Sequence, residues 1–353
     1  MGGSLLLFLM GAYGILGARS KDISRLSTMY SAEGDLSKSY GGPDSTDIAV
    51  GADRITRTVR GVTPFFIGRN GSTEQEAVSF WFTRRRLGAP WPYRIKTNLH
   101  IGAGVWPTTD ESLDKWATEY MDALGSLDGL AAGWYRPFAE SESALLDYAA
   151  PTAFRTPLRS LEPYYCIPNH RWTRHLSGKR VAVVSSFSES IRSQVESAER
   201  MHSIWNSLQE PSSILSLTAT WIPIRTYFPP EVALGDFTQW PEGISNWEAA
   251  VSYIVEGVKA SGATVAIIGC GGLGMIIGGR LKALGISVVI MGGAIQVLFG
   301  IKGRRWENHD VISKFWGPAW VWPKESETPR GSFQIEGGCY WKLGGSAPST
   351  TPR

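Results

Sequence analysis

The sequence is poor in cysteine and histidine. Its 353 residues contain three Cys and five His, and neither type recurs at the short spacing that zinc sites use. The cysteines, Cys166, Cys270 and Cys339, show no disulfide framework. Cys270 and Cys339 stand in apolar or glycine-rich surroundings, so we interpret them as small buried hydrophobic residues. The sequence therefore indicates neither a zinc centre nor a disulfide-stapled scaffold.

An excess of one charge is also missing. Lys and Arg number 35 and Asp and Glu 32, which gives a net charge of +3. A charge this small does not indicate a nucleic-acid surface, and we expect no nucleic-acid partner. The basic run Arg84 to Arg86 is interpreted as a solvated helix end, with a phosphate clamp as the alternative. The motifs GxSxG and HExxH and the P-loop are absent, as are internal repeats.

No apolar run is long enough to indicate a membrane span, which needs about 20 residues. Residues 4–16 are nearly all apolar and have the length of a signal-peptide core, but no basic segment precedes them. Two interpretations stay open. The segment is a signal peptide or anchor, which implies the secretory pathway or Golgi and membrane association, or it is an ordinary apolar N-terminus.

The composition divides the chain into three parts. Residues 1–60 comprise the apolar segment and a linker rich in Ser, Gly, Asp and Arg, which we expect to be flexible. Residues 61–342 carry the regular patterns of one α/β domain. Residues 343–353 (GGSAPSTTPR from 344) are expected to be a disordered tail.

Buried-strand patterns alternate with helical patterns in the second half. Residues 180–185, 264–268 and 286–291 are β-branched runs without polar alternation, as in strands buried on both faces. Helical periodicity follows the first run over Ile191 to Trp205, with Ser186 and Glu189 as a capping box, and another helix separates the last two runs. This strand–helix–strand unit predicts an α/β fold with a Rossmann-like parallel sheet flanked by helices, and a less regular N-terminal extension.

The first half is less regular. We expect a strand at 62–68, then helices at 72–87, 110–124 and 140–148, with Thr73 and Glu76 as a capping box for the first helix. Prolines between 151 and 168 interrupt the chain. A strand within 215–224 and a helix that Ser245 and Glu248 would cap complete the pattern.

A glycine-rich turn, Gly269-Cys270-Gly271-Gly272-Leu273-Gly274, joins a predicted strand to a helix. Gly269, Gly271 and Gly274 match the dinucleotide-binding spacing, in which backbone N–H groups approach a phosphate. The next strand lacks the acidic residue that holds a nicotinamide cofactor's ribose. A phosphate site, close helix–strand packing without a ligand, and an NAD(P) oxidoreductase are the three interpretations.

Two other turns follow predicted strands. In the first, Arg69, Gly71 and Glu74 stand where α/β ligand sites form; Arg69 would pair with a diphosphate and Glu74 would bind a divalent metal or act as a base. The alternative is a helix-capping loop. In the second, the Ser186 hydroxyl would bind phosphate or cap a helix.

The segment 292–306 follows the last strand. Its candidate donor-binding residues are Gly293, Lys302, Arg304, Arg305 and Trp306. The cations would neutralise a diphosphate, and Trp306 would stack on a base or sugar. A basic surface loop is the alternative. Further on, the sequence offers Tyr340 and Trp341 as an aromatic platform, whereas Glu325 and Glu327, between prolines, are expected in a solvated loop.

Several blocks together resemble the family with a GT-D fold-like domain. They read IGRNGSTE, GKRVAVVSSFSESIRSQ, IIGCGGLGMIIGGRLKALG, GGAIQVLFGIKGRRWENHDVISKFW and IEGGCYW, and they extend from about Phe65 to Trp341. The resemblance implies a glycosyltransferase that binds a nucleotide sugar on a Rossmann-like sheet and, through an Asp-x-Glu signature, uses Mn²⁺ or Mg²⁺. At the corresponding turn this chain keeps Glu74 but not the aspartate.

We therefore expect a glycosyltransferase that moves a sugar from a nucleotide-diphosphate donor to a glycan acceptor. Gly269, Gly271 and Gly274 would line the donor phosphates, and Lys302 with Arg304 or Arg305 would offset the charge of the leaving diphosphate. The alternatives are a nucleotide-sugar- or carbohydrate-binding protein with a degenerate site, and an NAD(P)-dependent oxidoreductase.

Overall fold

A computed structural model describes residues 46–342. Its centre is a seven-stranded sheet in the order β3-β2-β1-β7-β6-β4-β5, with all neighbouring strands parallel. The strands are β1 (Phe66–Arg69), β2 (Gly129–Ala131), β3 (Phe154–Thr156), β4 (Arg180–Ser185), β5 (Thr220–Arg225), β6 (Val265–Gly269) and β7 (Ser287–Ile290). The predicted Rossmann-like α/β fold with a parallel sheet is confirmed.

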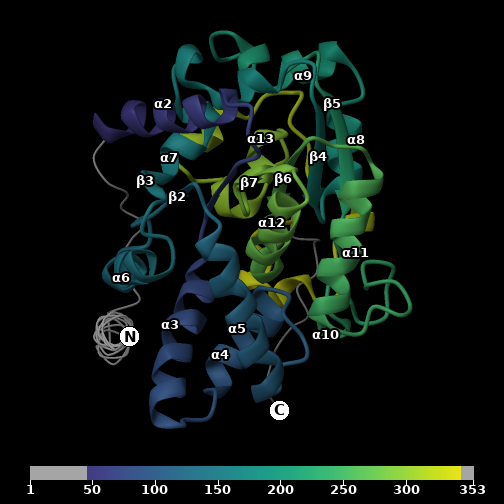
Figure 1. Cartoon of the computed structure of the whole chain (residues 1–353). Helices are drawn as coiled ribbons and strands as arrows, with labels where there is room; N and C mark the ends of the chain where they lie inside the picture. The colour runs from purple at the N-terminus through teal and green to yellow at the C-terminus, as the bar shows by residue number, and fades with distance from the viewer. Residues whose placement is uncertain (1–45, 343–353) are drawn as a thin grey trace, which may run out of the picture.

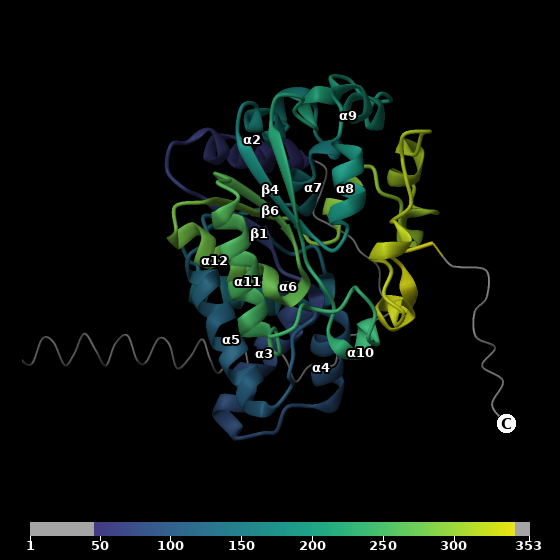
Figure 2. The same cartoon turned by 90° about the vertical axis from the view of Figure 1, so that its right-hand side faces the viewer.

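Helices cover both faces of the sheet, because successive strand residues point to opposite faces and both sets are apolar. On the first face lie α3 (Ser72–Leu87), α4 (Tyr93–Thr97), α5 (Asp110–Gly125), α6 (Ala139–Ala149), α11 (Trp247–Ala260) and α12 (Gly274–Ala283). On the second lie α2 (Thr46–Arg60), α7 (Leu158–Leu161), α8 (Ser188–Gln194), α9 (Ala198–Ile204) and α13 (Ala294–Leu298). Figure 2 shows α11 and α12 on one side of β4 and β6, with α8 and the yellow C-terminal segment on the other.

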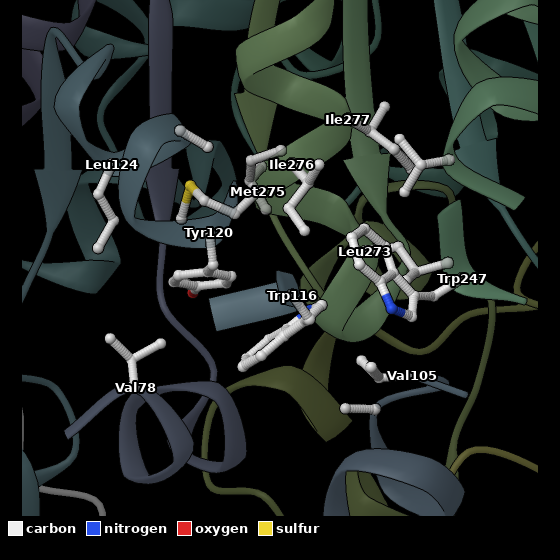
Figure 3. Close-up of a cluster of buried hydrophobic side chains, with 14 of the residues drawn as sticks. Val78, Val105, Trp116, Tyr120, Leu124, Trp247, Leu273, Met275, Ile276 and Ile277 are labelled. Atoms are coloured by element: carbon white, nitrogen blue, oxygen red, sulfur yellow. The ribbon is translucent and has the colours of Figure 1, made fainter. Parts of the chain in front are cut away.

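The core of the first face is anchored by two buried tryptophans (Figure 3). Trp116 from α5 lies below the turn that follows β6, and its indole nitrogen donates to Gly272 O at 2.9 Å. Trp247 opens α11, and its indole nitrogen donates to Ser112 Oγ at 3.1 Å. Both side chains are fully buried. Trp116 therefore ties the glycine-rich turn to α5, and Trp247 ties α11 to α5.

At the carboxyl ends of neighbouring strands, the chain turns alternately to one face of the sheet and to the other. It passes from β1 into α3 and from β6 into α12 on the first face, but from β7 into α13 and from β4 into α8 on the second. Because β1, β7, β6 and β4 are adjacent in this order, the exit alternates at every step (Figure 1). Such reversals open a crevice beyond the strand ends, where α/β proteins bind ligands.

Most predicted elements are present with small boundary shifts. The helix over 72–87 and the strand over 180–185 have the predicted bounds. The short strands β2 and β3 were not predicted. Two proposed caps are wrong: the N-cap of α3 is Gly71, without a side-chain bond, and that of α11 is Asn246, whose Oδ1 accepts from Ala249 N at 2.8 Å.

The single helix predicted over 191–205 is also wrong. Two helices, α8 and α9, follow β4, because Ser197 interrupts the helix and accepts a hydrogen bond from Arg200 N at 3.2 Å. The Ser186 and Glu189 capping box does not form: the N-cap of α8 is Phe187, without a side-chain bond of its own. A residue far along the chain supplies that cap, as described below.

The linker predicted to be flexible contains helix α2 over residues 46–60. Its side chains Ile55 and Val59 are fully buried in the second face's core, so contacts remote in sequence stabilise a segment of polar composition. The apolar segment at 4–16 and the predicted tail lie outside the described residues. Within residues 46–342, no helix is long and apolar enough to cross a membrane.

Candidate functional site

One cavity of about 590 Å³ lies along the carboxyl edge of the sheet. The turns after β1, β4, β5, β6 and β7 all contribute to its wall, together with the segment 101–104 and the C-terminal segment 335–341. The alternating chain exits therefore open a single continuous site. A cavity of this size suits a small-molecule ligand or cofactor.

The turn after β1 supplies a cation and a buried carboxylate. Arg69 Nε donates to Asn70 O at 3.2 Å, and the guanidinium lies 4.3 Å from the centre of the Trp134 ring. Glu74, in the first turn of α3, is 7% exposed and lines the cavity. Burial raises the pKa of Glu74, while its own backbone N–H and the charge of Arg69 oppose the rise. A carboxylate with a raised pKa is a better proton acceptor than an exposed one.

Asn70, between these two residues, points away from the cavity. Its amide nitrogen donates to Glu142 Oε1 at 2.8 Å, and its oxygen accepts from the Tyr120 hydroxyl at 2.8 Å. Glu142 also accepts from Gly133 N at 2.6 Å. Asn70 is 1% exposed. It therefore joins β1, α5 and α6 rather than contributing to the site.

The turn after β7 faces the turn after β1. A Cβ on Gly292 would lie 2.5 Å from Arg69 Nη1, and one on Gly293 would lie 3.1 Å from Arg305 Nη1. Arg305 Nη2 donates to Glu336 Oε2 at 2.6 Å, and its guanidinium lies 4.6 Å from the Tyr340 ring centre. The two glycines therefore make room for two arginines at the same strand end.

The glycine-rich turn after β6 is covered by protein backbone. Gly271 adopts a φ of 47°, and a Cβ there would lie 2.6 Å from Ala103 O. The same carbonyl accepts from Gly272 N at 2.8 Å. Gly269 is equally confined, with Gly292 O at 2.7 Å from a Cβ. Close packing by the chain itself therefore accounts for these glycines, although Gly269 and Gly271 still line the cavity.

The N-terminus of α8 already has an anionic partner. Glu327 Oε1 accepts from Glu189 N at 2.7 Å and from Ser190 N at 3.0 Å, and its other oxygen accepts from the Ser190 hydroxyl. Glu327 is 1% exposed, so its assignment to a solvated loop is wrong. The prediction failed because the two partners are far apart in sequence. Ser186 itself lines the cavity.

Most of the predicted site residues meet at this cavity. Those that line it are Arg69, Gly71, Glu74, Ser186, Gly269, Gly271, Gly293, Arg305 and Trp306. Gly274, Lys302 and Arg304 do not. Lys302 lies 5.4 Å from the Trp316 ring centre, and Arg304 donates to Gly337 O at 3.0 Å. Of the three basic residues in that segment, Arg305 is the one at the cavity.

Sequence reasoning missed a second charged group in the wall. Arg159 donates to Glu162 Oε2 at 2.6 Å, and both line the cavity. Burial raises the pKa of Glu162, and Arg159 opposes the rise. His309 lies nearby, where burial and Arg159 lower its pKa. These residues come from the proline-interrupted and C-terminal segments, and no local pattern marked them.

Two cysteines, Cys270 and Cys339, also line the cavity. Burial raises the pKa of each to about 12. Both are therefore neutral thiols near pH 7, which does not suit nucleophilic catalysis. This agrees with their interpretation as small buried residues, although neither is completely enclosed.

The residues at the turn after β1 do not fit a divalent metal. Mn²⁺ and Mg²⁺ prefer several oxygen ligands, but Asn70 is turned away and Arg69 brings a positive charge beside Glu74. Among residues 46–342 no group of three or more His, Cys, Asp or Glu side chains is placed to hold a metal ion. We therefore assign no step to a metal.

Comparison with protein-family models, with curated proteins and with solved structures finds no match to this chain.

Proposed function

We propose that the chain is a glycosyltransferase whose donor is a nucleotide-diphosphate sugar. The observation that carries this proposal is the placement of Arg69 beside Gly292 and of Arg305 beside Gly293, with Glu74 in the wall of the same large cavity on the carboxyl edge of the sheet. Guanidinium groups recognise phosphate oxygens with paired hydrogen bonds. The aromatic rings of Trp306 and Tyr340 beside them suit a base or a sugar.

The chemistry assigned to these residues is a transfer between two oxygens. The acceptor hydroxyl oxygen forms a bond to the anomeric carbon of the donor, and the bond from that carbon to the diphosphate breaks. Glu74 takes the hydroxyl proton, for which its raised pKa is suited. Arg69 and Arg305 stabilise the negative charge that develops on the departing nucleoside diphosphate.

A binding protein without turnover is the second candidate. It is supported by the sequence of the turn after β1, which keeps Glu74 but has no aspartate. Asn70 in this turn serves the packing of β1 against α5 and α6. The oxidoreductase interpretation receives no such support. In a dinucleotide site the second glycine allows the backbone to approach the pyrophosphate, whereas Gly271 is in contact with Ala103.

A thermal-shift panel on the full chain tests the proposal. It contains UDP-, GDP-, CMP- and dTDP-linked sugars, each with and without Mn²⁺, and NAD(P)H. A ligand that binds only the folded state raises Tm, so we expect one nucleotide sugar to do so. Arg305→Ala should abolish the shift. Lys302→Ala, a charge removed from the same segment but outside the cavity, should keep it.

Two results would contradict the proposal. A shift with NADPH alone would favour an oxidoreductase, and an unchanged response in Arg305→Ala would remove that residue from the site. A nucleotide-sugar shift without transfer to any offered glycan would favour the binding protein.

A further inference from the structure

The turn that begins at Glu336 has a backbone that is unusual for its sequence. Glu336, Gly337 and Gly338 have φ angles of 46°, 65° and 74°, so all three are left-handed. Glycine adopts this conformation freely, whereas a residue with a Cβ does so at a cost in energy. Among residues 46–342, Glu336 is one of three such non-glycine residues, and of these it alone lines the cavity. Because strain of this kind collects at ligand sites and switches, the side chain of Glu336 is a candidate for a role there.

The Glu336 carboxylate accepts hydrogen bonds from three other residues of the cavity wall. Its Oε2 accepts from Arg305 Nη2 at 2.6 Å and from Cys339 Sγ at 3.5 Å. Its Oε1 accepts from the Tyr340 hydroxyl at 3.3 Å. All four residues line the cavity. Carboxylates and phosphates both accept paired hydrogen bonds from a guanidinium. The carboxylate therefore holds donors that a phosphate in the cavity would also use.

The ion pair between Arg305 and Glu336 is only partly shielded from water. The side chain of Arg305 is 26% exposed and that of Glu336 is 49% exposed. An ion pair this exposed contributes little to stability, because water screens the attraction. A phosphate offers the guanidinium charge-assisted hydrogen bonds of the same kind, and a diphosphate brings more negative charge than one carboxylate. A diphosphate can therefore replace the carboxylate at Arg305.

Other hydrogen bonds hold the turn in place without the carboxylate. Arg304 Nη1 donates to Gly337 O at 3.0 Å. Arg305 N donates to Cys339 O, also at 3.0 Å. These bonds join the main chain of the turn to the segment that carries Arg305. The side chain of Glu336 can therefore leave the guanidinium while the main chain of the turn stays in position.

We propose that Glu336 is an internal anion that the diphosphate of the ligand displaces from Arg305. In the ligand-free protein the carboxylate neutralises the guanidinium and competes with the ligand. When the ligand binds, a phosphate oxygen accepts from Arg305 in its place and the Glu336 side chain turns toward solvent. This inference rests on the proposed function, in which Arg305 binds the diphosphate. Because the carboxylate can return to Arg305, the exchange also favours release of the nucleoside diphosphate after transfer.

The test measures binding of inorganic pyrophosphate and of UDP, GDP, CDP and dTDP to the full chain by calorimetry. Glu336→Gln keeps the size of the side chain but removes its charge. It should bind the active probe about fivefold more tightly, the factor that corresponds to about 1 kcal/mol. Glu336→Gly, which suits the left-handed backbone, should do the same. In the Arg305→Ala protein, Glu336→Gln should give no gain. The matched control Glu307→Gln removes a charge from the exposed surface nearby and should stay within about twofold of the wild type.

Weaker binding by Glu336→Gln would overturn the inference, because the carboxylate would then hold Arg305 in position for the ligand. So would an affinity equal to that of the wild type, or no binding of any probe to either protein. The proposed function fails differently. If pyrophosphate binds Glu336→Gln more tightly but no nucleotide sugar binds, the exchange stands and the donor is wrong. If binding of a nucleotide sugar depends on Arg305 but not on Glu336, the function stands and the exchange is wrong.

Discussion

The carboxylate of Glu74 occupies the space that a Cβ on Gly71 would fill. Gly71 has a φ of −79° and a ψ of 153°, which any residue adopts without strain. Its lack of a side chain is therefore required by Glu74 and not by the backbone. At Gly292 a Cβ would meet Arg69 Nη1, and there the backbone favours glycine as well, because φ is 57°. Glycines at these strand ends determine where the charged groups lie.

Gly71→Ala should displace the Glu74 carboxylate and leave the fold intact. If Glu74 is the base, transfer activity should fall at least about tenfold, as for loss of a positioned proton acceptor. Gly71→Ala combined with Glu74→Ala should lose no more than Glu74→Ala alone. The measurement is kcat with the donor found in the ligand panel. Gly317→Ala, where a Cβ meets open space, is the control. If the double variant lost as much activity as the two single variants combined, Gly71 would not act through Glu74.

Burial of Glu74 should make stability depend on pH. Its pKa is raised above 4.5, so the folded state binds more protons than the unfolded state in the range above that value. The stability associated with the neutral form is present below pH 4.5 and is lost as pH rises through the raised pKa. From pH 4.5 to 8, the Tm of the wild-type protein should fall relative to that of Glu74→Gln. If the Tm of the two proteins changed with pH in parallel, Glu74 would not cause the dependence. Glu242→Gln, on the exposed surface, is the control.

Loss of the Glu327 carboxylate should destabilise the protein. It accepts three hydrogen bonds from Glu189 and Ser190 at the start of α8, and Glu327→Ala leaves these buried donors unsatisfied. We expect the free energy of unfolding to fall by about 3 kcal/mol. Urea denaturation measures it. Glu325 is an exposed residue of the same turn, and Glu325→Ala should change the free energy of unfolding by less than about 0.5 kcal/mol. If the two variants lost the same stability, Glu327 would not act as the cap of α8.

Gly271 and Gly274 should respond differently to the same substitution. In Gly271→Ala the new Cβ would lie 2.6 Å from Ala103 O, and the backbone there has a φ of 47°. The free energy of unfolding should therefore fall by about 2–4 kcal/mol. In Gly274→Ala the nearest atoms are 3.7 Å away, and stability should be unchanged or higher by up to about 1 kcal/mol. Thermal unfolding without ligand distinguishes them. Equal stability of the two variants would show that Gly271 is not confined by packing.

The sequence by itself determined the class of fold and the strongest local elements. The strand Arg180–Ser185 is marked by a continuous β-branched run, and the helix Ser72–Leu87 by apolar residues at helical spacing, so their positions needed no tertiary information. The glycine-rich turns also followed from the sequence, because glycine marks tight backbone wherever it clusters. Since parallel strands end at the same edge, several site candidates were found together.

The tertiary structure decided what those turns are for. Gly271 is confined by Ala103, and Glu327 caps a helix more than a hundred residues earlier in the chain. Arg305 reaches the cavity while Lys302, three residues away, does not. Arg159 and Glu162 carry no local pattern at all. Such roles depend on which segments the sheet order brings together, and neighbouring residues in the sequence do not specify that order.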